Sequence, residues 1–115
     1  MDVFNIKDMT AGWFAGDFEP TAYSTKDFEV SYRVHPKGEG YYGKEDIHYH
    51  ILGTEINLLV SGKMVLQGIT LEAGDIFIIH PYEVTDPTFL EDCALICVKT
   101  PSRPGDKYVV EHVTK

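Results

Sequence analysis

Hydrophobic residues along this chain occur in short runs that turn residues interrupt every few positions. No segment keeps apolar residues at helical spacing for three turns, so the pattern predicts few helices. Many short strands at nearly regular spacing predict instead an all-β fold, a small antiparallel sandwich or barrel. The runs that favour strands are Phe28–Val34, Asp46–His50, Glu55–Val60, Lys63–Leu66, Ile76–Ile79, Ala94–Lys99 and Lys107–Glu111.

Two places along the chain lead to more detailed expectations. The pair Ser61-Gly62 predicts a tight hairpin turn between the strands on either side, because glycine readily adopts a positive φ. The run Ile76–Ile79 has no polar residue. It is too apolar for an exposed face, so we expect it to be buried.

The chain shows no internal repeat, low-complexity stretch or linker, which predicts one domain over residues 1–115. Its core is expected over 28–100, with a packing segment at 1–27 and a turn with a last strand at 101–115. The packing segment contains the only tryptophan, Trp13, next to Phe14 and close to Phe18. Since an exposed apolar patch favours association, we expect this segment to pack on the barrel or on a second subunit, in a homodimer.

Charge narrows the possible partners. The 115 residues include 10 Lys and Arg against 18 Asp and Glu, a net charge of −8. This sign argues against nucleic acid or an anionic membrane surface as the main partner, because both require a basic face. The longest run of aliphatic and aromatic residues, Ile76–Ile79, is too short to span a bilayer. We therefore expect no membrane partner.

The two cysteines, Cys93 and Cys97, lie four residues apart in a predicted strand. An extended chain separates them by roughly 13 Å, beyond disulfide reach. We expect both to be small buried side chains, in a cytoplasmic protein.

The candidate chemistry lies in the segment from His48 to Glu55. In a strand, His48 and His50 project to the same face, and Glu55 follows after a short bend that contains glycine. Two imidazoles and a carboxylate suit a divalent transition metal such as iron, manganese, zinc or nickel. The alternative is a histidine pair on a surface strand with Glu55 as a solvated charge.

This spacing, His48-x-His50-x4-Glu55-x6-Gly62, resembles the first motif of the cupin superfamily, G-x5-H-x-H-x3,4-E-x6-G, from its first histidine onward. Tyr42 occupies the position of the leading glycine. The resemblance implies a small antiparallel β-barrel or jelly roll, with a metal held in the barrel mouth by His48, His50 and Glu55.

The second cupin motif, G-x5-P-x-G-x2-H-x3-N, begins at Gly74 and then departs from the family pattern. Its proline, glycine, histidine and asparagine fall on His80, Tyr82, Thr85 and Phe89. The family's fourth ligand is this histidine, and threonine is a poor ligand for a divalent cation. Three possibilities follow: three ligands suffice, His80 supplies a fourth, or the barrel binds its ligand without metal.

Several other side chains are candidates for binding or catalysis. Asn57 shares the strand face of Glu55, and Tyr42 and Tyr49 flank the histidines, so these three with Thr85 could contact a ligand. Asn57 could equally be a polar residue satisfied at a strand crossing, and tyrosine is common in strands as a packing residue. Glu83 and Asp86 lie close to the expected barrel mouth, where either could act as a general base.

The remaining charged residues are expected at the surface. We expect His35 and His112 to be exposed, and Arg33 and Lys99 to lie on a solvated face, although contact with an acidic substrate is the alternative.

Two function classes remain open. The first is a metal-dependent enzyme acting on a small polar metabolite by isomerase, lyase or dioxygenase-type chemistry. The second is a non-catalytic barrel that binds a sugar-like or other small ligand, with or without metal. We favour the first class.

Overall fold

The computed structural model describes residues 1–39 and 47–110, and these ranges form an almost entirely β structure. A short 3₁₀ helix, η1 (Ile6–Asp8), precedes the strands. The strands are β1 (Trp13–Ala15), β2 (Glu29–His35), β3 (His48–Tyr49), β4 (Thr54–Ser61), β5 (Lys63–Leu66), β6 (Ile69–Glu72), β7 (Ile76–Ile79), β8 (Thr88–Phe89), β9 (Cys93–Thr100) and β10 (Tyr108–Val109).

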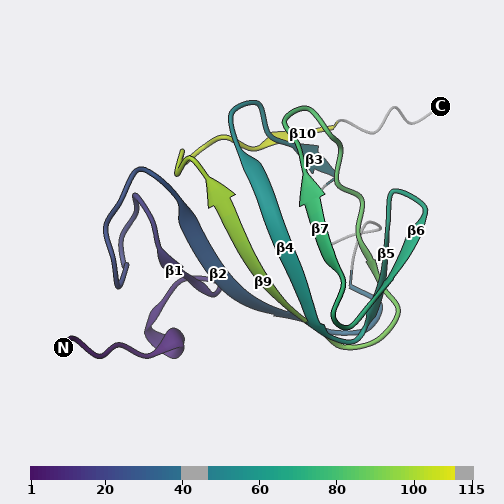
Figure 1. Ribbon diagram of the computed structural model, residues 1–115, viewed down its shortest axis with the longest axis horizontal. Helices are drawn as coiled ribbons and strands as arrows, with labels where there is room; N and C mark the ends of the chain where they lie inside the picture. The colour runs from purple at the N-terminus through teal and green to yellow at the C-terminus, as the bar shows by residue number, and fades with distance from the viewer. Residues whose placement is uncertain (40–46, 111–115) are drawn as a thin grey trace.

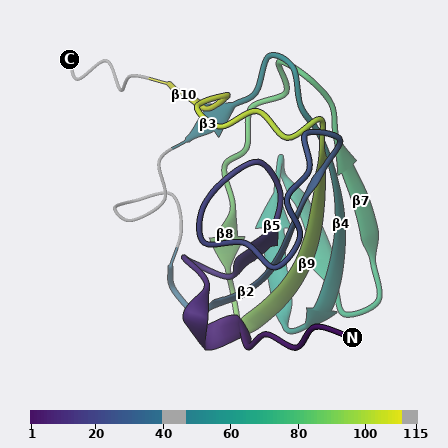
Figure 2. The same ribbon diagram turned by 90° about the vertical axis from the view of Figure 1, so that its left-hand side faces the viewer.

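The strands form antiparallel sheets, as Figure 1 shows. The largest sheet has the order β1-β2-β9-β4-β7, and a smaller one has the order β6-β5-β8. The pair β10-β3 lies across one end. Seen from the side, β5 and β8 face the large sheet across the interior (Figure 2). This arrangement confirms the predicted all-β jelly roll.

Most predicted strands are present with boundaries shifted by a few residues. Three short strands, β1, β6 and β8, were not predicted, because each has only two to four residues and no clear alternation. The run Lys107–Glu111 contains only β10, and its last residue lies outside the described part of the chain. Residue Asp46 also lies outside it.

Alternation along the large sheet places its charged residues on the inner face. The register aligns Glu29, Lys99 and Glu55 in one row, and Ser31, Cys97 and Asn57 in the next. The outer face carries aliphatic and aromatic side chains from the same strands. Those in β2, β9, β4 and β7 are Val30, Tyr32, Val34, Ala94, Ile96, Val98, Ile56, Leu58, Val60, Ile76 and Ile78.

The expectation that Ile76–Ile79 is buried was therefore wrong for half of the run. Ile76 is 70% exposed and Ile78 is 41% exposed, whereas Ile79 is buried and Phe77 partly buried. The reason is geometric. Strand β7 is at the edge of the large sheet, and alternation turns every second side chain to the outer face.

The predicted hairpin at Ser61-Gly62 was also wrong. Strand β4 pairs with β7 and β9, whereas β5 pairs with β6 and β8, so the chain passes from one sheet to the other at Gly62. The predicted positive φ is present, at +92°. A β-carbon at this position would lie 2.7 Å from Cys93 Sγ and even closer to the Asp92 carbonyl oxygen. Glycine is thus required where the two sheets meet.

The apolar core fills the space between the two sheets beside this crossing point. It comprises the buried side chains Leu59, Met64, Leu66, Ile79, Phe89, Cys93 and Leu95, with Leu71 and Phe77 packed against them. Cys93 and Cys97 are both buried and free, which confirms their predicted role as small interior residues.

The N-terminal aromatic segment packs on its own chain. Strand β1 pairs with β2, Trp13 lines the interior cavity and Ala15 is buried. The segment therefore does not itself require a second subunit. Within the described residues, no helix has the length and apolar character needed to cross a membrane.

We expect Gly62→Ala to lower the free energy of unfolding by about 3 kcal/mol or more, because it combines an unfavourable φ with a steric overlap. Gly74 is a matched control, since its φ of +95° is nearly the same but nothing lies within 4 Å of a β-carbon there. Gly74→Ala should cost only about 1–2 kcal/mol. Urea unfolding of both variants measures the difference, and equal losses would contradict the steric argument.

Candidate functional site

The inner face of the large sheet borders a cavity of about 340 Å³. Strands β2, β4, β7 and β9 contribute its lining, and further residues come from β3, β5 and the segment that leads to β8. A cavity of this size accommodates a small molecule.

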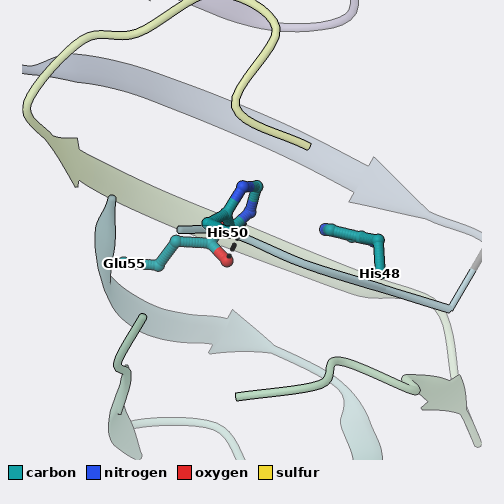
Figure 3. Close-up of side chains that lie close together, drawn as sticks. All are labelled: His48, His50 and Glu55. Atoms are coloured by element: carbon teal, nitrogen blue, oxygen red, sulfur yellow. Dashed lines mark ion pairs between the residues drawn. The ribbon is translucent and has the colours of Figure 1, made fainter. Parts of the chain in front are cut away.

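His48, His50 and Glu55 converge on this cavity (Figure 3). One ligand atom from each lies within 4.8 Å of the others, and His50 is buried while the other two are partly buried. His50 Nε2 lies 3.3 Å from Glu55 Oε2, and the two imidazole rings meet edge to face with centroids 5.1 Å apart. The three predicted ligands are therefore brought together.

The position of His50 depends on Asp106, in the turn before β10. The Asp106 backbone carbonyl accepts a hydrogen bond from His50 Nδ1, which places the ring proton on Nδ1 and directs Nε2 to Glu55. The Asp106 carboxylate accepts bonds from the backbone N–H groups of residues 51–53, at 2.8–3.3 Å. One residue thus holds both His50 and the bend between His50 and Glu55.

The pKa values of the pair agree with this geometry. Burial alone would lower the pKa of His50, but the bonds to Glu55 and to the Asp106 carbonyl outweigh it and raise the pKa above 6.5. Burial alone would raise the pKa of Glu55, but the bond to His50 and its charge lower it below 4.5. Without metal, the two side chains therefore form a charged pair in mildly acidic solution.

Thr85 lies beside His48. Its backbone pairs with that of His48, and its hydroxyl oxygen is 3.3 Å from both ring nitrogens. Thr85 is buried and lines the cavity. The position aligned with the family's fourth ligand is thus adjacent to the cluster, with a hydroxyl in place of an imidazole.

Of the other predicted ligand contacts, Asn57 lines the cavity. Tyr49 does not: alternation along β3 turns it away from the histidines, and its ring stacks on Tyr82 and Tyr108 at centroid distances of 6.3 Å and 5.5 Å. Tyr42 lies outside the described residues.

Glu83, Asp86 and His80 are not brought to the cavity. The Glu83 carboxylate accepts bonds from the His80 backbone N–H and from Gln67 Nε2, at 3.0 Å and 3.3 Å. Asp86 accepts one from the Gln67 backbone N–H at 2.9 Å. These contacts stabilise surface turns. The exposed His80 is likewise outside the group of converging ligands in the described residues.

Three residues expected at the surface lie inside. His35 is buried, stacks on Phe89 and is 2.7 Å from Glu39 Oε1. Lys99 is only 7% exposed and forms an ion pair of 3.2 Å with Glu29, while Arg33 also lines the cavity. The expectation failed because the polar face of β2 and β9 is the inner one. His112 lies outside the described residues.

Two contributors to the site were missed from the sequence. Asp106 follows a Pro-Gly turn, which carries no ligand spacing, and its role arises only when residues 51–53 fold against it. Ser31 lines the cavity between Glu29 and Arg33. The alternation of polar and apolar residues in β2 contained this information, but not which face was interior.

Comparison with solved structures identifies the fold. An uncharacterized conserved protein with a double-stranded β-helix domain from Klebsiella pneumoniae superposes with a TM-score of 0.65 at 25% identity, over 76% of this chain and 74% of that one. A cupin protein from Bacteroides fragilis gives 0.55 at 24% identity, over 79% and 80%. The protein has the fold of a small cupin. This confirms the resemblance drawn from the histidine motif.

Other similar solved structures include two that are named as enzymes, a lyase and an isomerase. The DMSP lyase DddQ from Ruegeria pomeroyi gives a TM-score of 0.64 at 15% identity, over 85% of this chain but only 49% of that one. KdgF from Halomonas sp. matches at 21% identity, and a sugar phosphate isomerase of a cupin superfamily from Silicibacter pomeroyi at 19%. No protein-family model matches the chain, and no curated protein matches its sequence significantly.

We expect Asp106→Ala to lower the free energy of unfolding by about 2–4 kcal/mol, because three backbone N–H groups lose a charged acceptor. Asp106→Asn, which keeps one carbonyl oxygen, should lose less. Chemical denaturation measures both, with Asp27→Ala, at an exposed aspartate, as the control. An Asp106→Ala protein as stable as the control would contradict the assigned role.

Proposed function

We propose that this cupin is a metal-dependent enzyme that acts on a small polar metabolite at His48, His50 and Glu55. The observation that carries this proposal is the convergence of three ligand atoms, within 4.8 Å of one another, at the edge of a cavity with room for a substrate.

The donor set fits a divalent transition metal such as iron, manganese, zinc or nickel. The Asp106 carbonyl holds His50 as the Nδ1–H tautomer, so that neutral Nε2 is available as a ligand opposite a carboxylate oxygen. Three protein ligands leave coordination positions open for water or substrate. When bound, such an ion would polarise a substrate oxygen.

Neighbouring residues would keep this ligand set in its ligating form. Cys97 donates to Glu55 Oε1 over 3.4 Å, and burial together with the Glu55 charge raises the pKa of its thiol. Cys97 therefore remains a neutral donor that orients the carboxylate. The Asp106 carboxylate restrains the bend that carries His50 toward Glu55.

The reaction we propose is isomerase, lyase or dioxygenase-type chemistry. Matching folds include lyases and an isomerase, which supports the ability of this scaffold to hold such sites. A shared fold does not select among reactions. We therefore propose the substrate only as a class, a small polar molecule.

Two observations favour a second function, a non-catalytic barrel that binds a sugar-like or other small ligand. His50 and Glu55 already satisfy one another as an ion pair, and Thr85 occupies the position of the family's fourth ligand. In that case the cavity would bind its ligand through hydrogen bonds alone.

We further propose a cytoplasmic location, which the two free, buried cysteines support.

We expect the purified protein to contain close to one equivalent of transition metal by elemental analysis. The double substitution His48→Ala/His50→Ala should abolish it, because two of the three ligands are lost. His80→Ala is the matched control and should leave the metal content unchanged, since the exposed His80 is outside the ligand group.

The same measurement as a function of pH tests histidine ligation. Because the metal requires neutral imidazoles and a proton competes at His50, whose pKa is raised, metal should be lost as the pH falls below about 6. Full retention at pH 5, or a wild-type protein without metal after reconstitution, would contradict the metal-dependent function.

A further inference from the structure

Two buried polar atoms in the cavity lack any partner in the described structure. They are Ser31 Oγ and Asn57 Nδ2. Ser31 is 0% exposed and Asn57 is 6% exposed, and both line the cavity. Buried polar groups in native proteins almost always have hydrogen-bond partners, so two unpartnered ones facing the same space indicate that water or a ligand completes their bonding there.

These two residues belong to one row of the large sheet. Ser31 on β2 and Asn57 on β4 both align with Cys97 on β9, which lies between them. Strand spacing places them roughly 10 Å apart. The neighbouring row contains Glu55, so the two polar groups lie next to the proposed metal ligands.

The described part of the cavity lining carries more cations than carboxylates, although the protein is acidic. Histidines aside, the ionisable lining residues within 1–39 and 47–110 are three cations, Arg33, Lys99 and Lys107, and two carboxylates, Glu29 and Glu55. These residues have an excess of one positive charge, in a chain whose net charge is −8. A metal ion would add to it. A concave site of this kind concentrates small anions.

Both carboxylates that line the described cavity already have partners, so they do not cancel its attraction for small anions. Glu29 is bound by Lys99 at 3.2 Å and accepts a bond from Ser102 Oγ at 2.8 Å. Glu55 is engaged by His50 and Cys97. The unsatisfied groups that remain are donors, the amide of Asn57 and the hydroxyl of Ser31, next to the guanidinium of Arg33.

We propose that Ser31, Asn57 and Arg33 form a subsite that binds the carboxylate of a small acidic substrate. This inference rests on the proposed function and names its substrate class. The amide and hydroxyl donate to the carboxylate and to a polar group beside it, and Arg33 supplies the opposite charge. The other end of the substrate then faces His48, His50 and Glu55.

The test compares small hydroxy acids with their uncharged amides. Lactate and malate are the probes, lactamide and malamide are their neutral counterparts, and inorganic phosphate is a separate arm. Titration calorimetry and thermal shift are measured on the metal-loaded and metal-free wild type. We expect at least one carboxylate to bind at least about tenfold more tightly than its amide and more tightly than phosphate.

Substitutions distinguish a binding role from a structural one. Ser31→Ala and Asn57→Asp should each weaken carboxylate binding at least about tenfold, whereas Ser24→Ala, at an exposed serine, should not. Because Ser31 Oγ has no partner to lose, Ser31→Ala should unfold at the wild-type temperature or above it. Lower affinity without lower stability is the expected result for a binding residue.

Four results would overturn this subsite: no binding of either carboxylate, amides that bind as well as acids, phosphate that binds more tightly than any carboxylate, or variants with unchanged affinity. The subsite and the metal-dependent function can fail independently of one another. Carboxylate binding by a wild type that takes up no metal would leave the subsite standing while the proposed function failed. Metal uptake without carboxylate binding would overturn the subsite and leave the proposed function standing.

Discussion

The structure depends on one constraint, the inward orientation of the charged side chains of the large sheet. In a strand, consecutive side chains point to opposite faces, so the placement of one residue decides that of all the others. Here the row Glu29, Lys99 and Glu55 faces the interior, with the cation between two carboxylates. Isolated buried charges are very unfavourable, but in this order each has an opposite neighbour.

Some polar groups of the inner face have no partner within the described residues, and the proposed site lies beside them. Lys99 and Ser102 engage Glu29, whereas Glu55 is held by His50 and Cys97 next to an open cavity. In the next row, polar atoms of Ser31 and Asn57 have no partner. Burying polar groups without a partner costs stability, and a bound ligand that accepts their hydrogen bonds would offset that cost.

Burial of the apolar core offsets this loss of stability. It gathers between the two sheets around Leu59, Met64 and Leu95, near the close contact at Gly62 where the chain changes sheets. Burial of these side chains supplies the main favourable free energy of folding. Asp106 then restrains the bend after His50 through three backbone N–H groups, which holds the ligand set in place.

The sequence by itself determined the fold class and the candidate group of His48, His50 and Glu55. Short alternating runs predict antiparallel strands because alternation is a local property, and the spacing of His48, His50 and Glu55 needs only one strand and one bend to bring the three together.

Which face of the sheet is interior is not a local property of the sequence. Arg33, Lys99 and His35 were expected at the surface because polar faces usually contact water. The outer isoleucines of β7 were expected inside because their run contains no polar residue. Only the tertiary structure decided this point, since it depends on β5 and β8 packing over the polar face. The role of Asp106 likewise arises from a contact across more than fifty residues, which no local pattern encodes.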